Sequence, residues 1–398
     1  MTEFSVYCQL GGTDRRFWGL MAWLAIPLVL GAAAFLYIEH YGHIATGMDN
    51  QIVWGLPHVF AVFLIVAAIG ALNVAMAASV FGKADYEPVA PLSALVSMAL
   101  LVGGLALLML DLARVDRMMV AMTHLNTSSI FALRAVLYNG FLASVAVYLW
   151  FLLERRMNRY VKAAAIVALF WQLLLATGTG LMFGAMVARA AYDSVLLVPV
   201  FIAFSAAYGT AVFILVLLAA CRWDSRPIAE ELLRRLKNVL AICVGASLYC
   251  AALFYFSKYY VARSHDVGQF LLFDGGVYTA LLWLGQVAIG GIAPLALLMR
   301  SQVSRRTVAA AAGLVVLGGL AQVYVTVIGG QAYPQILFPG MIETSSFFDG
   351  EVHPYKPSLA EALFGLGGVG LAVAVIAVAL RALALLPERL DQMTRPRA

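Results

Sequence analysis

The sequence predicts an all-α integral membrane protein with ten transmembrane helices. Its residues are 63% hydrophobic and only 12% charged, and the mean hydropathy is +0.90. Apolar runs of about 20 residues recur along the chain, and each is long enough to cross about 30 Å of hydrocarbon as a helix. A helix satisfies its own backbone groups in lipid, so a helical bundle is expected. The expected spans are approximately 18–38, 54–81, 90–110, 129–153, 161–186, 193–220, 238–257, 274–299, 307–328 and 359–385.

The first span follows a pair of basic residues, Arg15 and Arg16. A signal peptide or a twin-arginine leader is the alternative for such a segment. The apolar run 18–38 is longer than the apolar part of a signal peptide, and Phe17 directly follows the arginine pair. We therefore expect an uncleaved first helix.

Basic residues sit in the connections between the later spans, and they predict the orientation. Nineteen of the 26 Lys and Arg residues fall on the side of the two termini, six fall on the other side, and Arg134 falls inside the fourth span. By the positive-inside rule, both termini are expected in the cytoplasm, which requires an even number of spans. This distribution is typical of an inner-membrane protein rather than of a nucleic-acid-binding one.

Haem and metal sites are not expected. The four cysteines, at positions 8, 221, 243 and 250, show no CxxC or zinc-like spacing. Of the six histidines, His58 alone lies in a predicted span, so a bis-histidine haem site within the membrane would lack its second ligand.

The most informative segment runs from Asp111 to Arg117, directly after the third span. Its two acids and two bases lie at the rim of the hydrocarbon, where charge is costly unless it is paired or used. His58 is about one turn deep in the second span, on the same side of the membrane. Arg134 and Tyr138 lie one helical turn apart in the fourth span, also near this side. The structural alternative is that Asp111 pairs with an arginine merely to end helices at the headgroups.

The functional interpretation is a proton-coupled site for a lipid-soluble redox carrier. Oxidation of a quinol releases protons, and a histidine next to a carboxylate can accept them. His58 and Asp111 are the predicted catalytic residues. The predicted quinone-binding set is His58, Asp111, Arg114, Arg134, Tyr138 and Asn139. Asn73 is a candidate for a proton path, although such buried amides usually serve as hydrogen-bonding contacts between helices.

The segment around Asp111 resembles the D-L-G-R-P-x-R-F signature of the NrfD/PsrC, polysulfide reductase-like, membrane subunits. The acid and both arginines keep their spacing, whereas Ala113, Val115 and Met118 replace the Gly, Pro and Phe of the signature. Residues 50–60 and 329–370 resemble more specifically the HybB-like and DsrP-like branch, to which a membrane subunit of a sulfur-metabolism complex belongs.

This resemblance implies two four-helix bundles, about 54–186 with the quinone site and about 193–328, with flanking helices outside them. It implies a subunit that has no redox centre and uses menaquinol or ubiquinol as an exchangeable partner. A periplasmic iron–sulfur (ferredoxin-like) subunit would dock on the outer loop, 329–358. Other membrane and cytochrome subunits would complete the oxidoreductase complex.

Two other functions remain open. A secondary transporter of a small anion could use the arginines as binding groups, but transporters usually bind near the midplane on broken helices, and the charge here lies at the rim. The chain could also be a purely structural anchor that binds no quinone.

Overall fold

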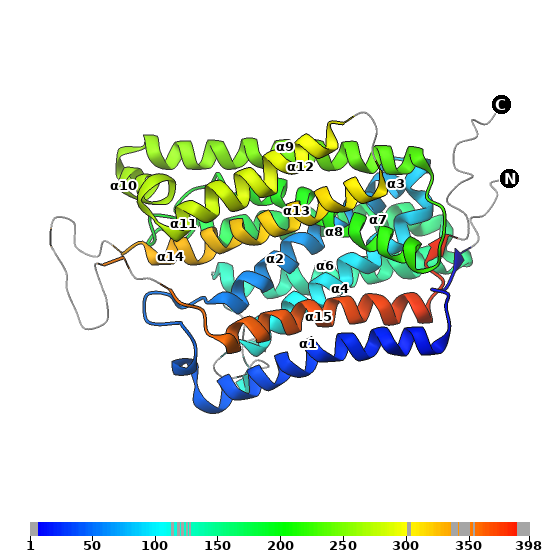
Figure 1. Ribbon diagram of the computed structural model, residues 1–398, viewed down its shortest axis with the longest axis horizontal. Coiled ribbons are helices and arrows are strands. Elements are labelled where there is room, and N and C mark those ends of the chain that lie inside the picture. The colour runs from blue at the N-terminus through cyan, green and yellow to red at the C-terminus, as the bar shows by residue number, and fades with distance from the viewer. Residues whose placement is uncertain are drawn as a thin grey trace.

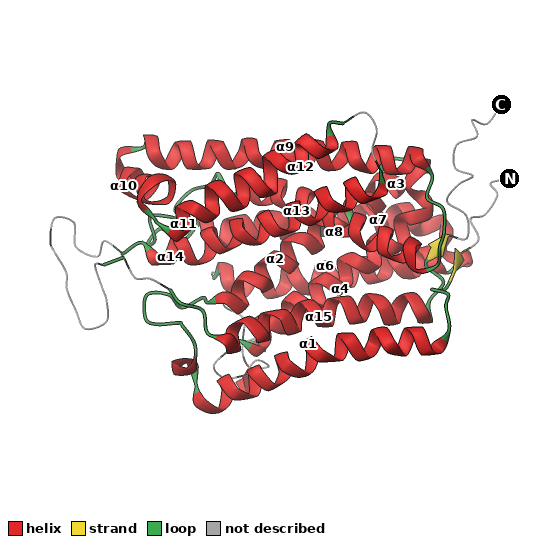
Figure 2. Ribbon diagram, in the orientation of Figure 1, coloured by secondary structure: helices red, strands yellow, loops and turns green. Residues whose placement is uncertain are grey.

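The computed structural model describes residues 7–112, 115–117, 120, 123–124, 126, 129–300, 304–335, 341, 351–352 and 355–387. Long helices run side by side through the molecule, and the described strands are two short segments at one end (Figures 1 and 2). Within the described residues, ten helices are long and apolar enough to cross a membrane. The predicted all-α integral membrane fold is confirmed, and the protein is a multi-pass membrane protein.

The long helices are α1 (Asp14–Tyr41), α2 (Leu56–Ala71) continued by α3 (Asn73–Ser79), α4 (Ala90–Leu110), α6 (Ile130–Leu153), α7 (Val161–Gly184), α8 (Leu197–Trp223), α9 (Glu230–Tyr260), α13 (Arg305–Tyr324) and α15 (Leu359–Ala382). The eighth span is mostly π-helical, η7 (Leu281–Ile292), between α11 (Val277–Ala280) and α12 (Ala293–Leu298). Shorter elements are β1 (Tyr7–Cys8), η1 (His43–Ala45), η2 (Ala84–Val89), η3 (Val115–Arg117), η4 (Arg155–Tyr160), η5 (Ala262–Ser264), α10 (His265–Gln269), η6 (Phe270–Asp274), η8 (Val325–Gly329), α14 (Gly330–Ala332) and β2 (Leu386–Pro387).

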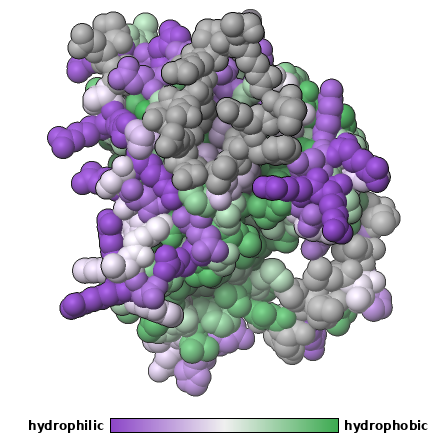
Figure 3. Space-filling model, turned by 90° about the vertical axis from the view of Figure 1, so that its right-hand side faces the viewer, coloured by the Kyte–Doolittle hydropathy of each residue, from purple (hydrophilic) through white to green (hydrophobic). Residues whose placement is uncertain are grey.

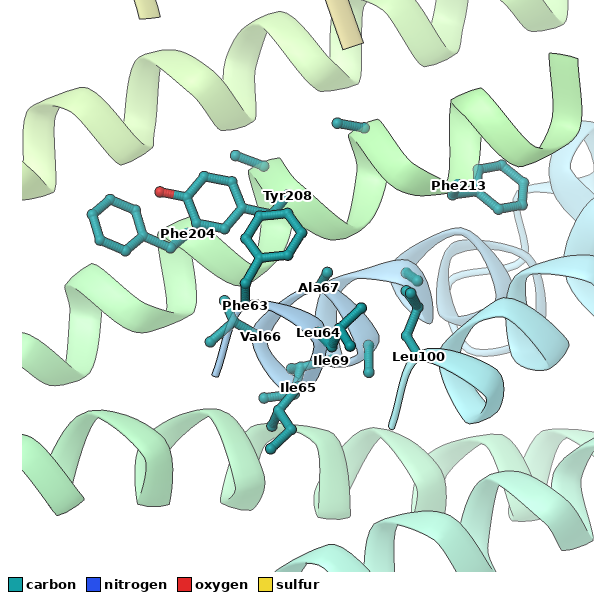
Figure 4. Close-up of a cluster of buried hydrophobic side chains, with 14 of the residues drawn as sticks. Phe63, Leu64, Ile65, Val66, Ala67, Ile69, Leu100, Phe204, Tyr208 and Phe213 are labelled. Carbon is teal, nitrogen blue, oxygen red and sulfur yellow. The ribbon is translucent and has the colours of Figure 1, made fainter. Parts of the chain in front are cut away.

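Helix α2 is the centre of the bundle. In the most apolar 18-residue window of its span, 89% of the residues are buried, against 11% for α1. It packs against α4 on one side and α8 on the other. Its Phe63 ring stacks on Tyr208 of α8, with the centroids 5.6 Å apart, in a cluster of large apolar side chains (Figure 4). Helix α1 instead packs against α15 and leaves much of its surface for lipid.

Two glycines allow α2 and α8 to touch at their crossing. A Cβ added to Gly209 would lie 2.1 Å from the backbone nitrogen of Ala71, and one added to Gly70 would lie 1.6 Å from the carbonyl oxygen of Ser205. Real Cβ atoms do not approach backbone this closely, so larger side chains would force the helices apart. Small residues that let backbones approach are the usual basis of helix packing in membranes.

The central span bends between α2 and α3, and a side chain from α4 bridges the break. Ser93 donates its hydroxyl to the Ala71 carbonyl (2.6 Å) and accepts from the Ala75 amide (3.1 Å). It thereby joins the two groups that a continuous helix would pair directly. Insertion of a side chain into the helical hydrogen-bond pattern is an established cause of helix bends.

The other helices pack around this core. Within residues 54–186, α4 contacts α6, α6 contacts α7, and α7 contacts α2. Within residues 193–328, α8 contacts α9 and α13, and α13 contacts η7. The division of the chain into two four-helix bundles stays a prediction.

The two ends of the bundle differ. One end carries the antiparallel pair β1–β2, in which Tyr7 pairs with Pro387, and we call it the terminal face. Figure 3 views this face, where hydrophilic residues gather around hydrophobic ones. The opposite end carries the first residues of α2 and the last residues of α4, and we call it the site face. The cytoplasmic location of the terminal face stays a prediction from the charge distribution.

Candidate functional site

The site face brings together the start of α2 and the end of α4. Pro57 lies in the first turn of α2, where a missing N–H costs nothing, and His58 follows it. Asp111 caps the C-terminus of α4, with its amide bonded to the Leu107 carbonyl (2.9 Å). The Nδ1 atom of His58 lies 3.1 Å from Oδ2 of Asp111, and the exposed fractions of the two side chains are 16% and 7%.

This contact sets the role of each imidazole nitrogen. When Asp111 accepts a hydrogen bond from Nδ1–H, the Nε2 atom of His58 is the nitrogen that can take up a proton. The resulting imidazolium would be stabilised by the carboxylate that it already touches. The pair can therefore accept a proton from a bound hydroxyl group.

Aromatic rings hold the imidazole in place. The Trp54 ring stacks on His58, with the centroids 5.5 Å apart and the planes 13° from parallel. Phe183 meets Trp54 edge-on at 5.9 Å, and Tyr192 lies 6.5 Å away. Such ring pairs contribute about 0.5–1.5 kcal/mol each beyond their buried area. They restrict the rotation of His58 away from Asp111.

Gln331 fixes the backbone on which Trp54 sits. Its Oε1 atom accepts from the amides of Val53 and Trp54, both at 3.0 Å. Its Nε2 atom donates to the carbonyls of Trp54 (3.0 Å) and Val327 (2.8 Å). The side chain is fully buried. The π-helical turn η8 precedes it, and π-turns change the direction in which the following side chains point.

A second set of contacts holds the first residue of α2. The Tyr355 hydroxyl accepts from the Leu56 amide (2.7 Å) and donates to Oε1 of Glu361 (2.5 Å). Glu361 is itself fully buried, and its Oε2 accepts from the amides of Gly47 and Ser358, both at 2.8 Å. Burial and then the Glu361 carboxylate raise the pKa of Tyr355 well above its ordinary value. Tyr355 therefore stays protonated and keeps donating.

A cavity of about 480 Å³ opens beside these residues, within the size range of small-molecule sites. Its polar wall includes His58, Asp111 and Asp49, and Trp54 supplies an aromatic surface. The full lining comprises His43, Ile44, Met48, Asp49, Asn50, Val53, Trp54, His58, Asp111 and Leu112. A smaller cavity of about 130 Å³ also touches Asp111, between α1, α4 and α15, and is lined in part by Glu39 and His43.

Three of the other predicted site residues do not line the described part of this cavity. Arg134 and Tyr138 are buried and bonded to each other, and Arg134 also contacts the sulfur of Met182 in α7. Among the described residues that line the cavity, neither is found. Asn139 is exposed and donates to the Ala135 carbonyl (2.8 Å) on its own helix. Arg114 lies outside the described residues.

Asn73 lies at the bend of the central span, toward the terminal face. Its Oδ1 atom accepts from Nε2 of Gln172 in α7 (2.6 Å), and the same nitrogen donates to the Ile69 carbonyl (2.8 Å). These hydrogen bonds stabilise the bend between α2 and α3. The role of Asn73 in a proton path stays a prediction. In the part of the chain that the structure describes, no group of three His, Cys, Asp or Glu residues is placed to hold a metal ion.

Sequence reasoning identifies His58 and Asp111 but misses Trp54, Gln331, Tyr355 and Glu361. A usable signal exists for Glu361, because Ser358 three residues earlier forms a capping box with it. The sequence places Gln331 in the last outer loop, whereas the ninth span continues through Ala332.

Comparison with known proteins agrees with this architecture. The family described as "Polysulphide reductase, NrfD" matches residues 45–335. The chain belongs to the NrfD family. The match includes the start of α2, the end of α4 and Gln331, and it ends before Tyr355 and Glu361.

Three relatives match almost over their full lengths. The chain is 26% identical over 387 residues to the "Hdr-like menaquinol oxidoreductase integral membrane subunit" of Archaeoglobus fulgidus, covering 96% of each chain. It is 27% identical over 412 residues to a putative dimethyl sulfoxide reductase membrane subunit of Halobacterium salinarum, covering 94% of this chain and 92% of the relative. It is 20% identical over 403 residues to a selenate reductase subunit of Mesobacillus selenatarsenatis, covering 92% of each. All three belong, by their names, to oxidoreductases.

Proposed function

We propose that this NrfD-family protein is the quinone-interacting membrane subunit of a multisubunit oxidoreductase. It would exchange electrons between menaquinol or ubiquinol and an iron–sulfur subunit docked at the site face. The observation that carries the proposal is the His58–Asp111 pair, which lines the 480 Å³ cavity at the rim of the membrane. The name of the Archaeoglobus relative, a menaquinol oxidoreductase membrane subunit, supports it.

The residues of the cavity would act on the hydroxyl groups of a quinol. Oxidation of the quinol to the quinone releases two electrons and two protons. The Nε2 atom of His58 would accept a proton from the nearer hydroxyl, and Asp111 would hold the charged ring in place. Because His58 and Asp111 can each hold one proton before passing it to water, the pair can serve both deprotonations in turn. The electrons would leave to the docked subunit.

Apolar side chains in the connections of the site face support docking of a partner. Ile44 is 92% exposed and Val195 is 75% exposed, and both lie outside the membrane spans. Apolar surface outside the lipid region marks contact with another protein when it is contiguous, and these two side chains would be part of such a surface. We propose that residues 329–358 contribute to this surface. Residues 336–340, 342–350 and 353–354 of that segment lie outside the described residues.

The branch of the family is proposed from the resemblance of residues 50–60 and 329–370 to HybB-like and DsrP-like subunits. This would place the complex in sulfur metabolism, with cytochrome and further membrane subunits as partners. Co-purification with a ferredoxin-like subunit would support the branch. Purification with a molybdenum-containing reductase instead would contradict it.

The test replaces the proposed base and leaves its neighbour in place. His58→Asn keeps a side-chain N–H that can reach Asp111 but removes Nε2. Loss of a general base typically lowers a rate by about 100-fold or more, so quinol oxidation by membranes that contain the complex is expected to fall by that factor. His40→Asn is the matched control, because His40 is exposed at the end of α1.

The readout is menaquinol and ubiquinol oxidation, with co-purification of the partner subunits as the measure of assembly. Unchanged turnover in both His58→Asn and Asp111→Asn would overturn the proposed site. Uptake of a labelled anion by the purified protein in liposomes would favour a transporter. Absence of binding of a quinone analogue in calorimetry would favour a structural anchor.

A further inference from the structure

A second cavity lies at the terminal face, far along the bundle from His58. It measures about 740 Å³ and lies between the C-terminal part of α8, the connection 224–229 and the first turns of α13. Figure 3 shows the end of the molecule that carries it. Its lining residues are Leu215, Leu218, Ala219, Cys221, Arg222, Ser225, Arg226, Pro227, Ile228, Arg305, Arg306 and Ala309. None of these residues belongs to the proposed quinone site.

One wall of this cavity is apolar. Leu215, Leu218 and Ala219 of α8 face Ala309 of α13 across it. Leu215 lies seven residues before Arg222, so the apolar wall extends about 10 Å along the helix axis from the arginine. One turn beyond Ala309, a Cβ added to Gly313 would meet nothing within 4 Å. This wall runs along the helix axis, so the upper part of an acyl chain could lie against it.

The rim of the cavity is cationic. Arg222, Arg305 and Arg306 are exposed there. Among the described residues, the ion pairs of this face use other arginines: Arg226 with Asp224, Arg234 and Arg235 with Glu231, and Arg381 with Asp14.

One of these three arginines makes a single weak contact with the protein. A guanidinium nitrogen of Arg305 lies 3.4 Å from the Ile228 carbonyl, which leaves its other N–H groups available. The N-terminus of α13, capped by Ser304, adds the positive end of a helix dipole at the same place. The rim therefore holds three arginines for which no ion pair with a described carboxylate is found.

We propose that this cavity binds an anionic phospholipid of the leaflet at the terminal face. Its phosphate would lie between Arg222, Arg305 and Arg306, and one acyl chain would lie along Leu215, Leu218 and Ala309. Guanidinium groups bind phosphate oxygens through paired N–H donors. Basic pockets between transmembrane helices at the cytoplasmic side suit anionic headgroups. A soluble phosphate would satisfy the rim but leave the apolar wall unused.

The test measures lipid binding by the purified full chain in detergent. Phosphatidylglycerol and phosphatidylcholine in mixed micelles are titrated against the protein, and inorganic phosphate is titrated alone. An arginine at a membrane surface contributes about fivefold to the binding of an anionic lipid, so Arg222→Gln with Arg306→Gln is expected to weaken phosphatidylglycerol binding roughly 25-fold. Arg159→Gln is the matched control, because Arg159 is exposed in η4, outside the lining residues of this cavity.

A second variant tests the acyl-chain part and keeps the arginines. Ala309→Leu fills the apolar wall, so phosphatidylglycerol binding is expected to fall while inorganic phosphate binding is unchanged. Native mass spectrometry should show a co-purified anionic phospholipid on the wild type and less of it on both variants. Equal affinity for phosphatidylcholine, or equal loss in Arg159→Gln, would overturn the proposal. Inorganic phosphate that binds as tightly as the lipid would show a free-anion site instead.

Discussion

Replacement of Gln331 by leucine tests whether the backbone around Trp54 is held from the ninth span. The native amide makes four hydrogen bonds, two of them accepted from the amides of Val53 and Trp54. Leucine fills a similar volume and removes all four. The amides of Val53 and Trp54 then lose the acceptor that Gln331 provides.

The free-energy cost of the substitution is estimated from the Val53 and Trp54 amides. An unsatisfied buried donor costs about 1–3 kcal/mol. Val53 is 50% exposed, so water reaches the loop once it moves, and the lower end of the range applies to each donor. The sum is about 2 kcal/mol, which corresponds to a roughly 30-fold increase in the opening of residues 51–54. The Val327 carbonyl keeps the Tyr192 hydroxyl as a partner (2.6 Å) and adds little, whereas the lost donor of the Trp54 carbonyl adds to this sum.

Hydrogen exchange of the 51–54 amides, followed by mass spectrometry, measures this change. Gln286→Leu is the matched control, because Gln286 is 5% exposed and its Oε1 atom lacks a hydrogen-bond partner within the described structure. There, leucine is expected to be neutral or stabilising. We also expect Gln331→Leu to lower kcat/KM for quinol without loss of assembly, because Trp54 would no longer hold His58. Identical exchange of residues 51–54 in Gln331→Leu and the wild type would refute the reasoning.

Two further predictions concern the Tyr355 contacts at the start of α2 and the crossing of α2 and α8. Tyr355→Phe removes a hydrogen bond to a charged group and is expected to lower the free energy of unfolding by about 1.5–3 kcal/mol. Since burial and Glu361 raise the pKa of Tyr355, this stabilisation is fully present below about pH 10 and is lost as the pH rises above it. The difference in Tm between the wild type and the variant should therefore be constant from about pH 6 to 9 and should narrow above about pH 10. Gly209→Val should abolish the monodisperse peak in size-exclusion chromatography because its side chain would collide with the α2 backbone, whereas Gly313→Ala, which meets nothing within 4 Å, should not. A soluble, quinone-binding Gly209→Val protein would contradict the proposed close packing.

The spans were predictable because lipid imposes the same two requirements on each of them. Each must be apolar over about 20 residues and helical, and both properties can be seen in a single sequence. The depth of His58 and Asp111 followed from their distance to the span ends. Their lateral contact did not, because no sequence pattern states which helices are neighbours. The 3.1 Å separation depends on the packing of α2 against α4.

The misplaced and missed residues have physical reasons. Asn139 is adjacent in sequence to Tyr138, but one residue rotates the side chain by about 100° around a helix, which turns it to the exposed surface. Arg134 faces inward at the expected depth, toward α7 and Met182 rather than toward α4. Gln331 follows two glycines, which are typical of a loop, and the π-helical turn that extends the helix through it has no sequence signature comparable to an apolar run.

The pairing of β1 with β2 has a practical consequence for engineering the molecule. Arg226 donates to Sγ of Cys8 (2.7 Å) and to the Pro387 carbonyl (3.1 Å), so one side chain ties both strands to the connection after α8. Residues 7 and 387 are neighbours in space although they are separated by almost the entire polypeptide. A short peptide linker could therefore join them, and new ends could be opened in a connection at the opposite end of the bundle. Such a circular permutant would present fusion tags beside the cavity of His58 without altering a single membrane-embedded side chain.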